Sequence, residues 1–517
     1  MKATSTITAN AQIEWTLLVL GVIYSLAQLI LSWNNPILDQ HAFRQTQTAI
    51  SVYWMINGGD WLAYQTPVLG APWTLPLEFP LYQWVVATLV GTIKYFTLDQ
   101  AGRLVSEGFM LACIWPLWRI ASHYQNGRSL FRIAVILLLF SPIYAFWSRS
   151  FMIESTALFF SIWFVAALID FNKKATSFGF LESSTAGALA ACIKITTFVG
   201  FSFAGAFFML YTIYTERNMF LSVRHLTRYA LALGSMIISL TALMAWLHFG
   251  DSLKSESLFG SMFTAEALNS WNFGTLNQRM SPAFWQVVLS RAPTEAVGTW
   301  GIPLVCSLYA VIKLHKWRLI SYFALLILYL LPLMVFTNLH LIHHYYQYAN
   351  SIFLICAISL VLSDIASKHP KVGAILLVLI ISFEVYGYSK YFYNDQMQPN
   401  RELQLLLASY VRTNVASDQV VISFGLSWSS EVPYYAERRA LFVPDSAPPT
   451  TLDELSSNLS KYTGGLPVGA VIVCPNHFVD NTSTKIAFEE LVNKLTKDMR
   501  PRTVGYCKVY AGSSAGS

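Results

Sequence analysis

The chain has 517 residues, of which 55% are hydrophobic and 12% are charged, and its mean hydropathy is +0.46. A soluble domain does not tolerate such values, so the composition indicates a polytopic membrane protein. The formal net charge of +6 requires no nucleic-acid partner, because many Lys and Arg residues lie in short loops between apolar runs, as membrane orientation demands.

Apolar runs of about 20 residues, the length that crosses a bilayer as a helix, recur along most of the chain. The first of them, 13–33, is too long for a signal-peptide core and lacks a small-residue cleavage site, so we expect a retained span. About eleven spans are predicted, near 13–33, 101–119, 131–147, 154–171, 181–196, 198–214, 228–248, 297–313, 319–337, 346–364 and 372–391.

Short loops rich in Lys and Arg indicate the cytoplasmic side of a membrane protein. All of these basic loops lie on the cytoplasmic side only if the apolar stretch 80–96 does not cross the membrane. We therefore expect 40–57 and 80–96 to be two helices at the outer interface, with the amino terminus inside and the C-terminal tail outside. The basic loops are 119–132, 172–175, 216–228, 313–318 and 367–371.

This orientation places the unusual polar residues together on the outer side. Ionisable groups at membrane depth usually face a cavity or a partner, so the cluster predicts an outer-face site. Its members, taken from the first outer loop, two outer turns and the end of the fifth span, are Asp39, His41, Arg44, Glu78, Arg149, Glu154, Lys194, His340, His343 and His344.

The first interfacial helix carries several candidate residues. Asp39 stands before it, where a carboxylate serves either as an N-cap or as a general base for an acceptor hydroxyl. Arg44 either pairs with Asp39 or binds a phosphate bidentately. His41, on the same side of the helix as Arg44 and Gln45, is either an interfacial hydrogen-bonding group or a ligand of a phosphate or metal.

The other candidates have similar alternatives. Glu78 lies in the aromatic, proline-rich stretch APWTLPLEFPLYQW, where it serves as an acid or base or pairs with an arginine such as Arg149. Lys194 either extends to the interface or binds an anionic lipid headgroup. His343 and His344 are adjacent and point about 100° apart on a helix, so they suit donors to phosphate or sugar hydroxyls better than a zinc site.

These features resemble the GT-C superfamily of integral-membrane glycosyltransferases. The resemblance rests on the outer first loop with its opening Asp39, the Glu78 loop, the R-x-x-M-x-E turn that ends at Glu154, and the H-x-Y-Y turn that ends at Tyr346. The layout is similar to the lipid A aminoarabinose transferase and the protein O-mannosyltransferases. Many relatives carry an acidic pair where this chain has Asp39 followed by Gln40.

The resemblance implies transfer of a sugar from a polyprenyl-phosphate donor to a lipid or glycan acceptor on the outer face of the cytoplasmic membrane. It implies that Asp39 stands where the family has its catalytic first-loop aspartate, that Glu154 stands where it has a second conserved acidic residue, and that Lys194 and Arg44 lie near the lipid phosphate. The chemistry needs a base, for which Asp39, Glu78 and Glu154 are candidates, and stabilisation of the leaving phosphate. Arg149, Lys194 and the histidines suit that second task, and a divalent cation is compatible but not required.

Three other functions compete with this interpretation. A transporter or flippase of a lipid-linked glycan would line a pathway with its intramembrane charges, but the polar groups gather on one face and no inverted repeat is evident. A glycan ligase would share the same fold. A membrane scaffold would use only the tail for binding.

Composition changes near residue 395, so we expect a transmembrane catalytic domain at 1–394 and a small extracytoplasmic α/β domain at 395–517. Short β-branched runs predict strands within 418–425, 468–475 and 503–512, and a helical pattern covers 488–499. The stretch 431–439 is an aromatic and basic patch that either touches the acceptor or is solvated surface. Cys474 and Cys507 both lie in predicted strands on the outer side, where an oxidising compartment permits a disulfide.

Overall fold

The computed structural model describes residues 2–124, 126–219, 222–398, 402–475, 482–497 and 499–511. Two compact units are built from interleaved segments. The helical unit comprises Met1–Asn34, Arg103–Trp246 and Asn269–Met397. The mixed unit comprises Asn35–Gly102, Leu247–Leu268 and Gln398–Ser517. The division into domains at residue 394 stays a prediction, since neither unit is continuous in sequence.

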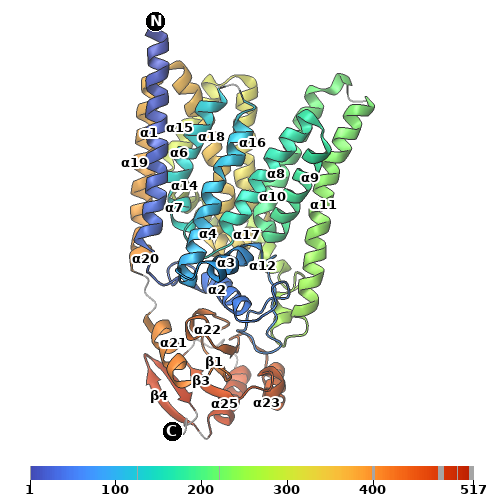
Figure 1. The fold of residues 1–517 in the computed structure, drawn as a ribbon, viewed down its shortest axis with the longest axis vertical. Helices are drawn as coiled ribbons and strands as arrows, with labels where there is room; N and C mark the ends of the chain where they lie inside the picture. Colours follow the sequence, from blue (N-terminus) through green and yellow to red (C-terminus); the bar gives the residue numbers. More distant parts are fainter. Residues whose placement is uncertain are drawn as a thin grey trace. The chain divides into compact units, whose positions relative to one another are not determined.

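Long helices dominate the helical unit, in which α1 packs against α6 and α19, and α8 against α9 (Figure 1). The helices up to α11 are α1 Lys2–Leu31, α4 Leu98–Ala112, α5 Ile114–Ala121, α6 Gly127–Phe140, α7 Pro142–Trp147, α8 Glu154–Lys174, α9 Ser177–Ile193, α10 Ile195–Thr215, η1 Arg217–Met219 and α11 Val223–Lys254. Those that follow are α12 Asn269–Phe273, α13 Leu276–Met280, α14 Pro282–Val297, α15 Gly301–Lys313, α16 Lys316–Val335, α17 Thr337–Ile342, η3 His344–Tyr346, α18 Gln347–Lys368, α19 Pro370–Tyr391 and α20 Tyr393–Met397.

Within the described residues, 8 helices are long and apolar enough to cross a membrane, or up to 9 if one bent pair counts as a single span. Eight of the eleven predicted ranges fall on these helices. The multi-pass membrane character predicted from composition is therefore confirmed. The 8 are Ala11–Leu31, Leu98–Ala121, Glu154–Lys174, Ile195–Thr215, Val223–Lys254, Lys316–Val335, His344–Lys368 and Pro370–Tyr391.

The three other predicted spans differ from single long helices for local reasons. The stretch 131–147 divides into α6 and α7 because Pro142 cannot donate the backbone hydrogen bond that would continue the helix. The range 297–313 belongs to a pair, α14 and α15, bent by 84° where Gly298 adopts a φ of +80°. The third, 181–196, falls on α9, which has 17 residues and ends where β-branched residues begin.

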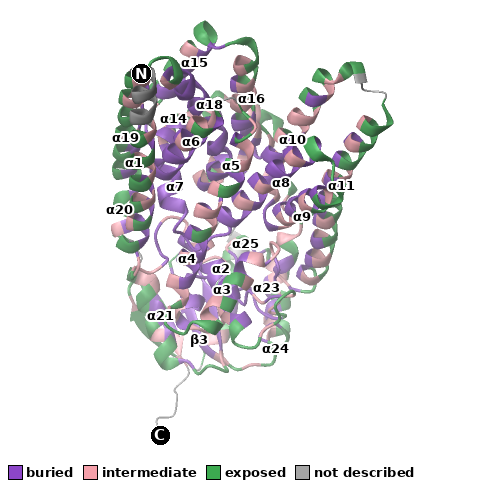
Figure 2. Cartoon of the chain, turned by 45° about the horizontal axis from the view of Figure 1, so that its top comes forward, coloured by how far each residue is buried: buried purple, intermediate pink, exposed green. Residues whose placement is uncertain are grey.

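Burial separates the central helices of this unit from the outer ones. In an apolar 18-residue stretch of the candidate span that contains α18, 89% of the residues are buried, against 28% in the corresponding stretch of α1. Figure 2 shows the same contrast between the buried surfaces of α8 and the exposed outward faces of α1 and α19. Apolar side chains on outward faces are what lipid contact requires, so the exposed Ile23 and Ile30 of α1 need no protein partner.

Glu384, in the middle of α19, provides a test of packing. Its side chain is fully buried, and neither carboxyl oxygen has a hydrogen-bond partner among the described residues. An unsatisfied buried polar group costs about 1–3 kcal/mol. We expect Glu384→Leu to raise the free energy of unfolding by about that amount, measured by thermal unfolding in lipid nanodiscs. Glu384→Gln, which keeps a polar group, is the control and should gain less; a strongly destabilised leucine variant would contradict the expectation.

The mixed unit contains a five-stranded sheet in the order β2-β1-β3-β5-β4. Strands β2 and β3 run parallel to β1, whereas β5 is antiparallel to both β3 and β4. The small C-terminal sheet predicted from sequence is therefore present. Its strands are β1 Val420–Phe424, β2 Arg439–Phe442, β3 Val468–Val473, β4 Arg500–Val504 and β5 Cys507–Ala511. The unit's helices are α2 Ala42–Ile56, α3 Leu81–Thr92, η2 Gly260–Phe263, α21 Glu402–Asn414, α22 Glu431–Ala436, α23 Pro449–Ser457, α24 Leu459–Tyr462 and α25 Thr482–Thr496.

Three details of the predicted tail differ from the structure. The single strand expected over 503–512 is a hairpin, because Gly505, with a φ of +60°, reverses the chain between β4 and β5. The stretch 431–439 is not a solvated surface patch, because five residues of its short helix α22 are buried: Glu431, Val432, Pro433, Tyr434 and Ala436. Its last residue opens the edge strand β2. The predicted helix 488–499 begins earlier, since α25 is Thr482–Thr496, and residue 498 lies outside the described residues.

The first loop packs directly on the sheet within the mixed unit. The backbone N–H of Ala440 donates to Pro67 O at 3.0 Å, and that of Phe442 donates to Val68 O at 2.7 Å, so the loop covers the outer edge of β2. Gly70 is required here: with a φ of +83°, a Cβ atom would lie 2.7 Å from a Leu441 methyl group. Leu69, Phe259 and Leu441 join a shared core with β1 and β3.

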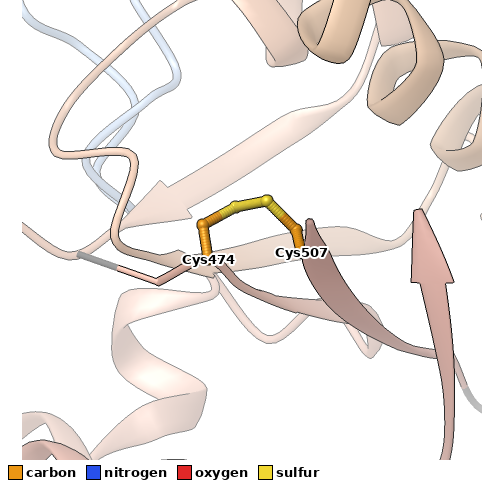
Figure 3. The surroundings of a disulfide bond; sticks show 2 residues. All are labelled: Cys474 and Cys507. Atoms are coloured by element: carbon orange, nitrogen blue, oxygen red, sulfur yellow. A yellow bond between two sulfur atoms is a disulfide. The ribbon is translucent and has the colours of Figure 1, made fainter. Parts of the chain in front are cut away.

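Cys474 and Cys507 form a disulfide bond, which Figure 3 shows between the end of β3 and the start of β5. The pairing follows from the sheet register, in which Val473 lies opposite Lys508. The bond closes a loop with a sequence separation of 33. It therefore links the parallel part of the sheet to its C-terminal hairpin.

Replacing both bonded cysteines by serine should destabilise this hairpin. A cross-link over such a loop contributes about 2–4 kcal/mol, mainly by restricting the unfolded chain. We expect faster amide hydrogen exchange in β3 and β5 of the double variant, measured by mass spectrometry on the full chain. Cys192→Ser, at a free cysteine in α9, is the control and should leave these peptides unchanged. Unchanged exchange in the double variant would contradict the expectation.

Candidate functional site

The first group of predicted site residues surrounds the start of α2 in the mixed unit. Asp39 is 6% exposed, and its Oδ1 accepts a hydrogen bond from Nε2 of Gln45. Nε2 of the fully buried Gln45 also donates to the carbonyl of Gln40 at 3.0 Å. The N-cap of α2 is His41, in a left-handed conformation and without a side-chain capping bond. The N-cap role considered for Asp39 is therefore wrong, and its carboxylate is held by a side-chain amide instead.

Arg44 and Glu78 form the second part of this group. The Arg44 guanidinium makes an ion pair with Glu78 and donates to the side-chain oxygen of Gln47. The loop that carries Glu78 is held by Tyr64, which accepts from the backbone N–H of Leu77 at 2.7 Å and donates to the Glu78 carbonyl at 3.0 Å. The sequence analysis gave pairing as one of two alternatives for each charge, with Asp39 as the partner considered for Arg44 and Arg149 as an example of a partner for Glu78. The structure instead pairs Arg44 with Glu78.

A second group lies in the helical unit, where α9 ends and α10 begins. Lys194 separates the two helices with an extended backbone, at φ −161° and ψ 96°. The β-branched sequence around it, Ile-Lys-Ile-Thr-Thr, weakens the helix at this point. The Lys194 ammonium lies 2.5 Å from a Glu154 carboxylate oxygen, and the two side chains are only 6% and 3% exposed. Glu154 is the first residue of α8, a position where the helix dipole stabilises a negative charge.

Two tyrosines face the same ammonium group. Nζ of Lys194 lies 4.4 Å from the ring centre of Tyr346 and 5.0 Å from that of Tyr345. Aromatic faces attract a cation, most strongly where water is excluded. His340 adds no positive charge near pH 7, because burial and the nearby Arg291 and Lys194 lower the pKa of its imidazole. The buried Lys194 side chain therefore contacts one carboxylate and two ring faces.

The remaining predicted residues lie in the same unit with other contacts. Arg149 is fully buried, and its guanidinium stacks 4.4 Å from the ring centre of Phe146. Nδ1 of His344 lies 3.4 Å from Glu295 Oε1, so this histidine already has an acidic neighbour. The ring of His343 contacts those of Tyr345 and Tyr346, at centroid distances of 5.5 and 6.1 Å.

Several residues that shape these groups escaped the sequence analysis. Tyr64 positions the Glu78 loop, and Glu295 neighbours His344. Tyr345, which belonged to the H-x-Y-Y turn but was not itself a candidate residue, forms half of the aromatic wall. Arg291 donates to the carbonyls of His340 and Leu341, which fixes the turn before Tyr345. The only sequence signal was an intramembrane arginine and glutamate in α14, which the rarity of charges in spans could have marked.

The two groups have complementary chemical capacities. The α2 group offers a buried carboxylate with one oxygen bonded to an amide, which suits proton transfer. The Lys194 group offers a cation in an aromatic, water-poor setting, which suits an anion. Within the described ranges, no group of three or more His, Cys, Asp or Glu residues has the arrangement of a metal site.

No protein-family model and no curated protein matches the sequence, but solved structures share the fold. ArnT from Cupriavidus metallidurans bound to undecaprenyl phosphate has a TM-score of 0.65 at 11% identity, covering 96% of this chain and 98% of that one. The archaeal oligosaccharyltransferase AglB from Archaeoglobus fulgidus, in complex with an inhibitory peptide and a dolichol-phosphate, has a TM-score of 0.57 at 11% identity, covering 97% and 74%. The apo oligosaccharyltransferase from the same organism has a TM-score of 0.56 at 12% identity, covering 89% and 69%.

These structures are GT-C superfamily membrane glycosyltransferases. At such low identity the likeness establishes the fold and no individual residue's role. The chain therefore has the GT-C fold, as the first-loop and turn motifs predicted.

Proposed function

We propose that this chain is a membrane glycosyltransferase that transfers a sugar from a polyprenyl-phosphate donor to a lipid or glycan acceptor. The reaction would take place on the outer face of the cytoplasmic membrane, on which side we also place the C-terminal sheet. The fold supports the enzyme class, and two similar structures contain a polyprenyl phosphate or a dolichol-phosphate. The observation that carries the proposal is the buried pair of Lys194 and Glu154 with its aromatic wall.

The Lys194 group is assigned to the phosphate of the donor. Glu154 provides the buried Lys194 ammonium group with a counter-ion in the absence of substrate, which offsets part of the cost of burying that charge. A lipid phosphate brings a stronger anion to the same ammonium group. Glu154 is proposed as the counter-ion of Lys194 and as a catalytic residue. Arg149 and His343 are proposed to contact the donor phosphate.

The Asp39 group is assigned to the acceptor. Asp39 is proposed as the general base, with Gln45 orienting its carboxylate through Oδ1. Arg44 and Glu78 are proposed to shape the first loop through their ion pair, with Glu78 as the alternative base. His41, His344 and Tyr346 remain proposed substrate contacts.

In the reaction, an acceptor hydroxyl oxygen attacks the anomeric carbon of the donor sugar. The bond between that carbon and the phosphate oxygen breaks, and its electron pair leaves with polyprenyl phosphate. The hydroxyl proton passes to the Asp39 carboxylate. Charge grows on the phosphate oxygens as the bond breaks, so a cation already in position, Lys194, lowers the barrier.

Transfer of radiolabelled sugar is the direct test. The full chain in nanodiscs would be given polyprenyl-phosphate sugars together with an extract of membrane lipids and glycans. Label in an extracted acceptor together with released polyprenyl phosphate, detected by mass spectrometry, is the expected result. Movement of the donor across the bilayer without release of polyprenyl phosphate would contradict the proposal and indicate a flippase. A heated sample serves as the blank.

A further inference from the structure

Arg439, at the start of the edge strand β2, packs against two tryptophan rings of the mixed unit. Its guanidinium carbon lies 4.2 Å from the ring centre of Trp54, in the last turn of α2, and 5.8 Å from that of Trp73. Side chains alternate along a strand, so Arg439 shares a face of β2 with Leu441. Leu441 belongs to the core shared by the first loop and the sheet, and Trp73 packs against that core. The half-buried Arg439 side chain therefore lies at the margin of the core.

Among the described residues, the Arg439 guanidinium has no counter-ion. Its Nε is buried without a hydrogen-bond partner, and its only contacts with charged or aromatic groups are the two tryptophan rings. Glu437, the nearest carboxylate along the chain, pairs instead with Arg412 at 2.8 Å and accepts from the Tyr53 hydroxyl at 3.4 Å. Burial lowers the pKa of the Arg439 guanidinium, and no carboxylate opposes that effect. The fold therefore holds a positive charge at this point without compensating it.

Trp54 adds a second unsatisfied donor to the same cluster. Its side chain is 8% exposed, and its indole N–H has no hydrogen-bond partner within the described ranges. Buried donors without partners are costly, so two of them on side chains in contact favour an acceptor from outside the chain. Trp73 is held in place by the turn at Gly464, where the φ is +63° and a Cβ atom would lie 3.4 Å from the indole nitrogen. Three separate segments thus build the cluster.

The chemistry of the cluster selects an anion. Arginine binds carboxylate and phosphate groups through parallel N–H donors while its plane stacks on an aromatic ring. A cationic ligand would be repelled by the guanidinium, and a neutral ligand would leave its charge without a counter-ion. The half-buried Trp73 ring adds amphipathic surface beside that charge.

We propose that Arg439, with Trp54 and Trp73, binds a carboxylate or phosphate group carried by the acceptor, so that the acceptor is an acidic glycan. The inference rests on the proposed transferase function and names a property of its acceptor. Asp39 lies just before α2 and Trp54 in its last turn, and α2 has 15 residues. At a rise of about 1.5 Å per residue, about 20 Å of helix separates the two. The anionic group is therefore remote from the hydroxyl that receives the sugar, and the acceptor is extended.

Saturation-transfer NMR on the full chain, in nanodiscs of phosphatidylcholine, tests binding without any need for catalysis. The probes are methyl glucuronide, which carries a carboxylate, glucose 6-phosphate, and the neutral methyl glucoside. We expect at least one of the two anionic sugars to bind about tenfold or more tightly than the neutral one, because a hydrogen bond to a charged group is stronger than one between neutral groups. Affinities are obtained by titration of each sugar.

Variants of one arginine separate its charge from its packing. Arg439→Gln should abolish the preference for the anionic sugar. Arg439→Lys keeps the charge but not the planar set of donors, so it should retain part of the preference. The matched control is Arg502→Gln, since Arg502 is exposed in the same unit and lies 5.4 Å from the ring centre of Tyr410. It removes the same charge and should leave the preference unchanged.

Three outcomes would overturn the proposal. The first is the absence of any preference for an anionic sugar in the wild type, and the second is an unchanged preference in Arg439→Gln. The third is binding of glycerol 3-phosphate as tight as that of either anionic sugar, which would assign the site to a lipid headgroup or free phosphate. Retention of the Cys474–Cys507 disulfide, checked by alkylation, shows that the variants are folded.

Turnover separates this inference from the transferase function itself. With the acidic glycans of the membrane extract as acceptors, Arg439→Gln should raise KM about tenfold or more and leave kcat unchanged, because the group binds far from the reacting atoms. A lower kcat at an unchanged KM would contradict a remote binding role. Absence of sugar transfer by the wild type would contradict the transferase function, and the NMR comparison would still decide whether Arg439 binds an anion.

Discussion

Replacing Asp39 by asparagine should lower sugar transfer by about 10²–10⁴-fold and leave donor binding unchanged. Asparagine has the same shape and can still accept the hydrogen bond from Gln45, so the start of α2 keeps its structure. It cannot take a proton from the acceptor hydroxyl, which is the step assigned to this carboxylate. The measurement is initial transfer rate beside equilibrium binding of polyprenyl phosphate, on the same preparation.

Asp60→Asn is the matched control in the same first loop. Asp60 is exposed and accepts hydrogen bonds from the backbone N–H groups of Leu62 and Ala63, both at 2.7 Å. Its replacement should leave the transfer rate within twofold of the wild type. If Asp39→Asn transfers sugar at the wild-type rate, Asp39 is not the base, and the same assay on Glu78→Gln and Glu154→Gln would then locate it.

Replacing Lys194 by methionine should have two separable effects. The first is on stability: Glu154, which is 3% exposed, would be left as an unpaired buried charge, at a cost of about 3–5 kcal/mol. The second is on function: a hydrogen bond to a charged group contributes about 1.5–3 kcal/mol, so donor affinity should fall by about 10–150-fold. Thermal unfolding and binding of polyprenyl phosphate in nanodiscs measure the two effects independently.

The double variant Lys194→Met with Glu154→Gln distinguishes the two effects. With both charges removed, no buried charge is left unpaired, so the free energy of unfolding should return toward that of the wild type. Donor affinity should stay low, because the ammonium group is still missing. The matched control is Arg132→Met with Glu14→Gln, which removes another ion pair of the same unit, 2.5 Å long, and should leave donor affinity unchanged. Wild-type donor affinity in the Lys194 double variant would refute the assignment of the phosphate site.

The spanning helices and the central strands could be predicted from sequence because their signals are local. An apolar run of about 20 residues has one stable arrangement in a bilayer, whatever surrounds it. The β-branched runs of β1 and β3 indicate buried strands in the same way. In two places where these predictions failed, a single residue decided the outcome: Pro142 ended α6, and Gly505 turned one expected strand into a hairpin.

Chemically distinctive residues were also visible in the sequence, but their partners were not. Asp39, Arg44 and Lys194 stand out because charged groups near apolar runs are rare and expensive. Arg44, however, pairs with Glu78, 34 residues away, and Lys194 with Glu154, 40 residues away. Each of these charges had several opposite charges within plausible reach, and only the packing of helices and loops selects one.

The sequence alone therefore determined the class of the protein, most of its spans and the residues with unusual chemistry, since each depends on composition or on a period of a few residues. Tertiary structure alone decided that the first loop shares a core with the C-terminal sheet, through Leu69, Gly70 and Leu441. It also brought Arg439 against the ring of Trp54. Such contacts join segments hundreds of residues apart, and they arise from complementary shape, which has no period for a sequence pattern to reveal.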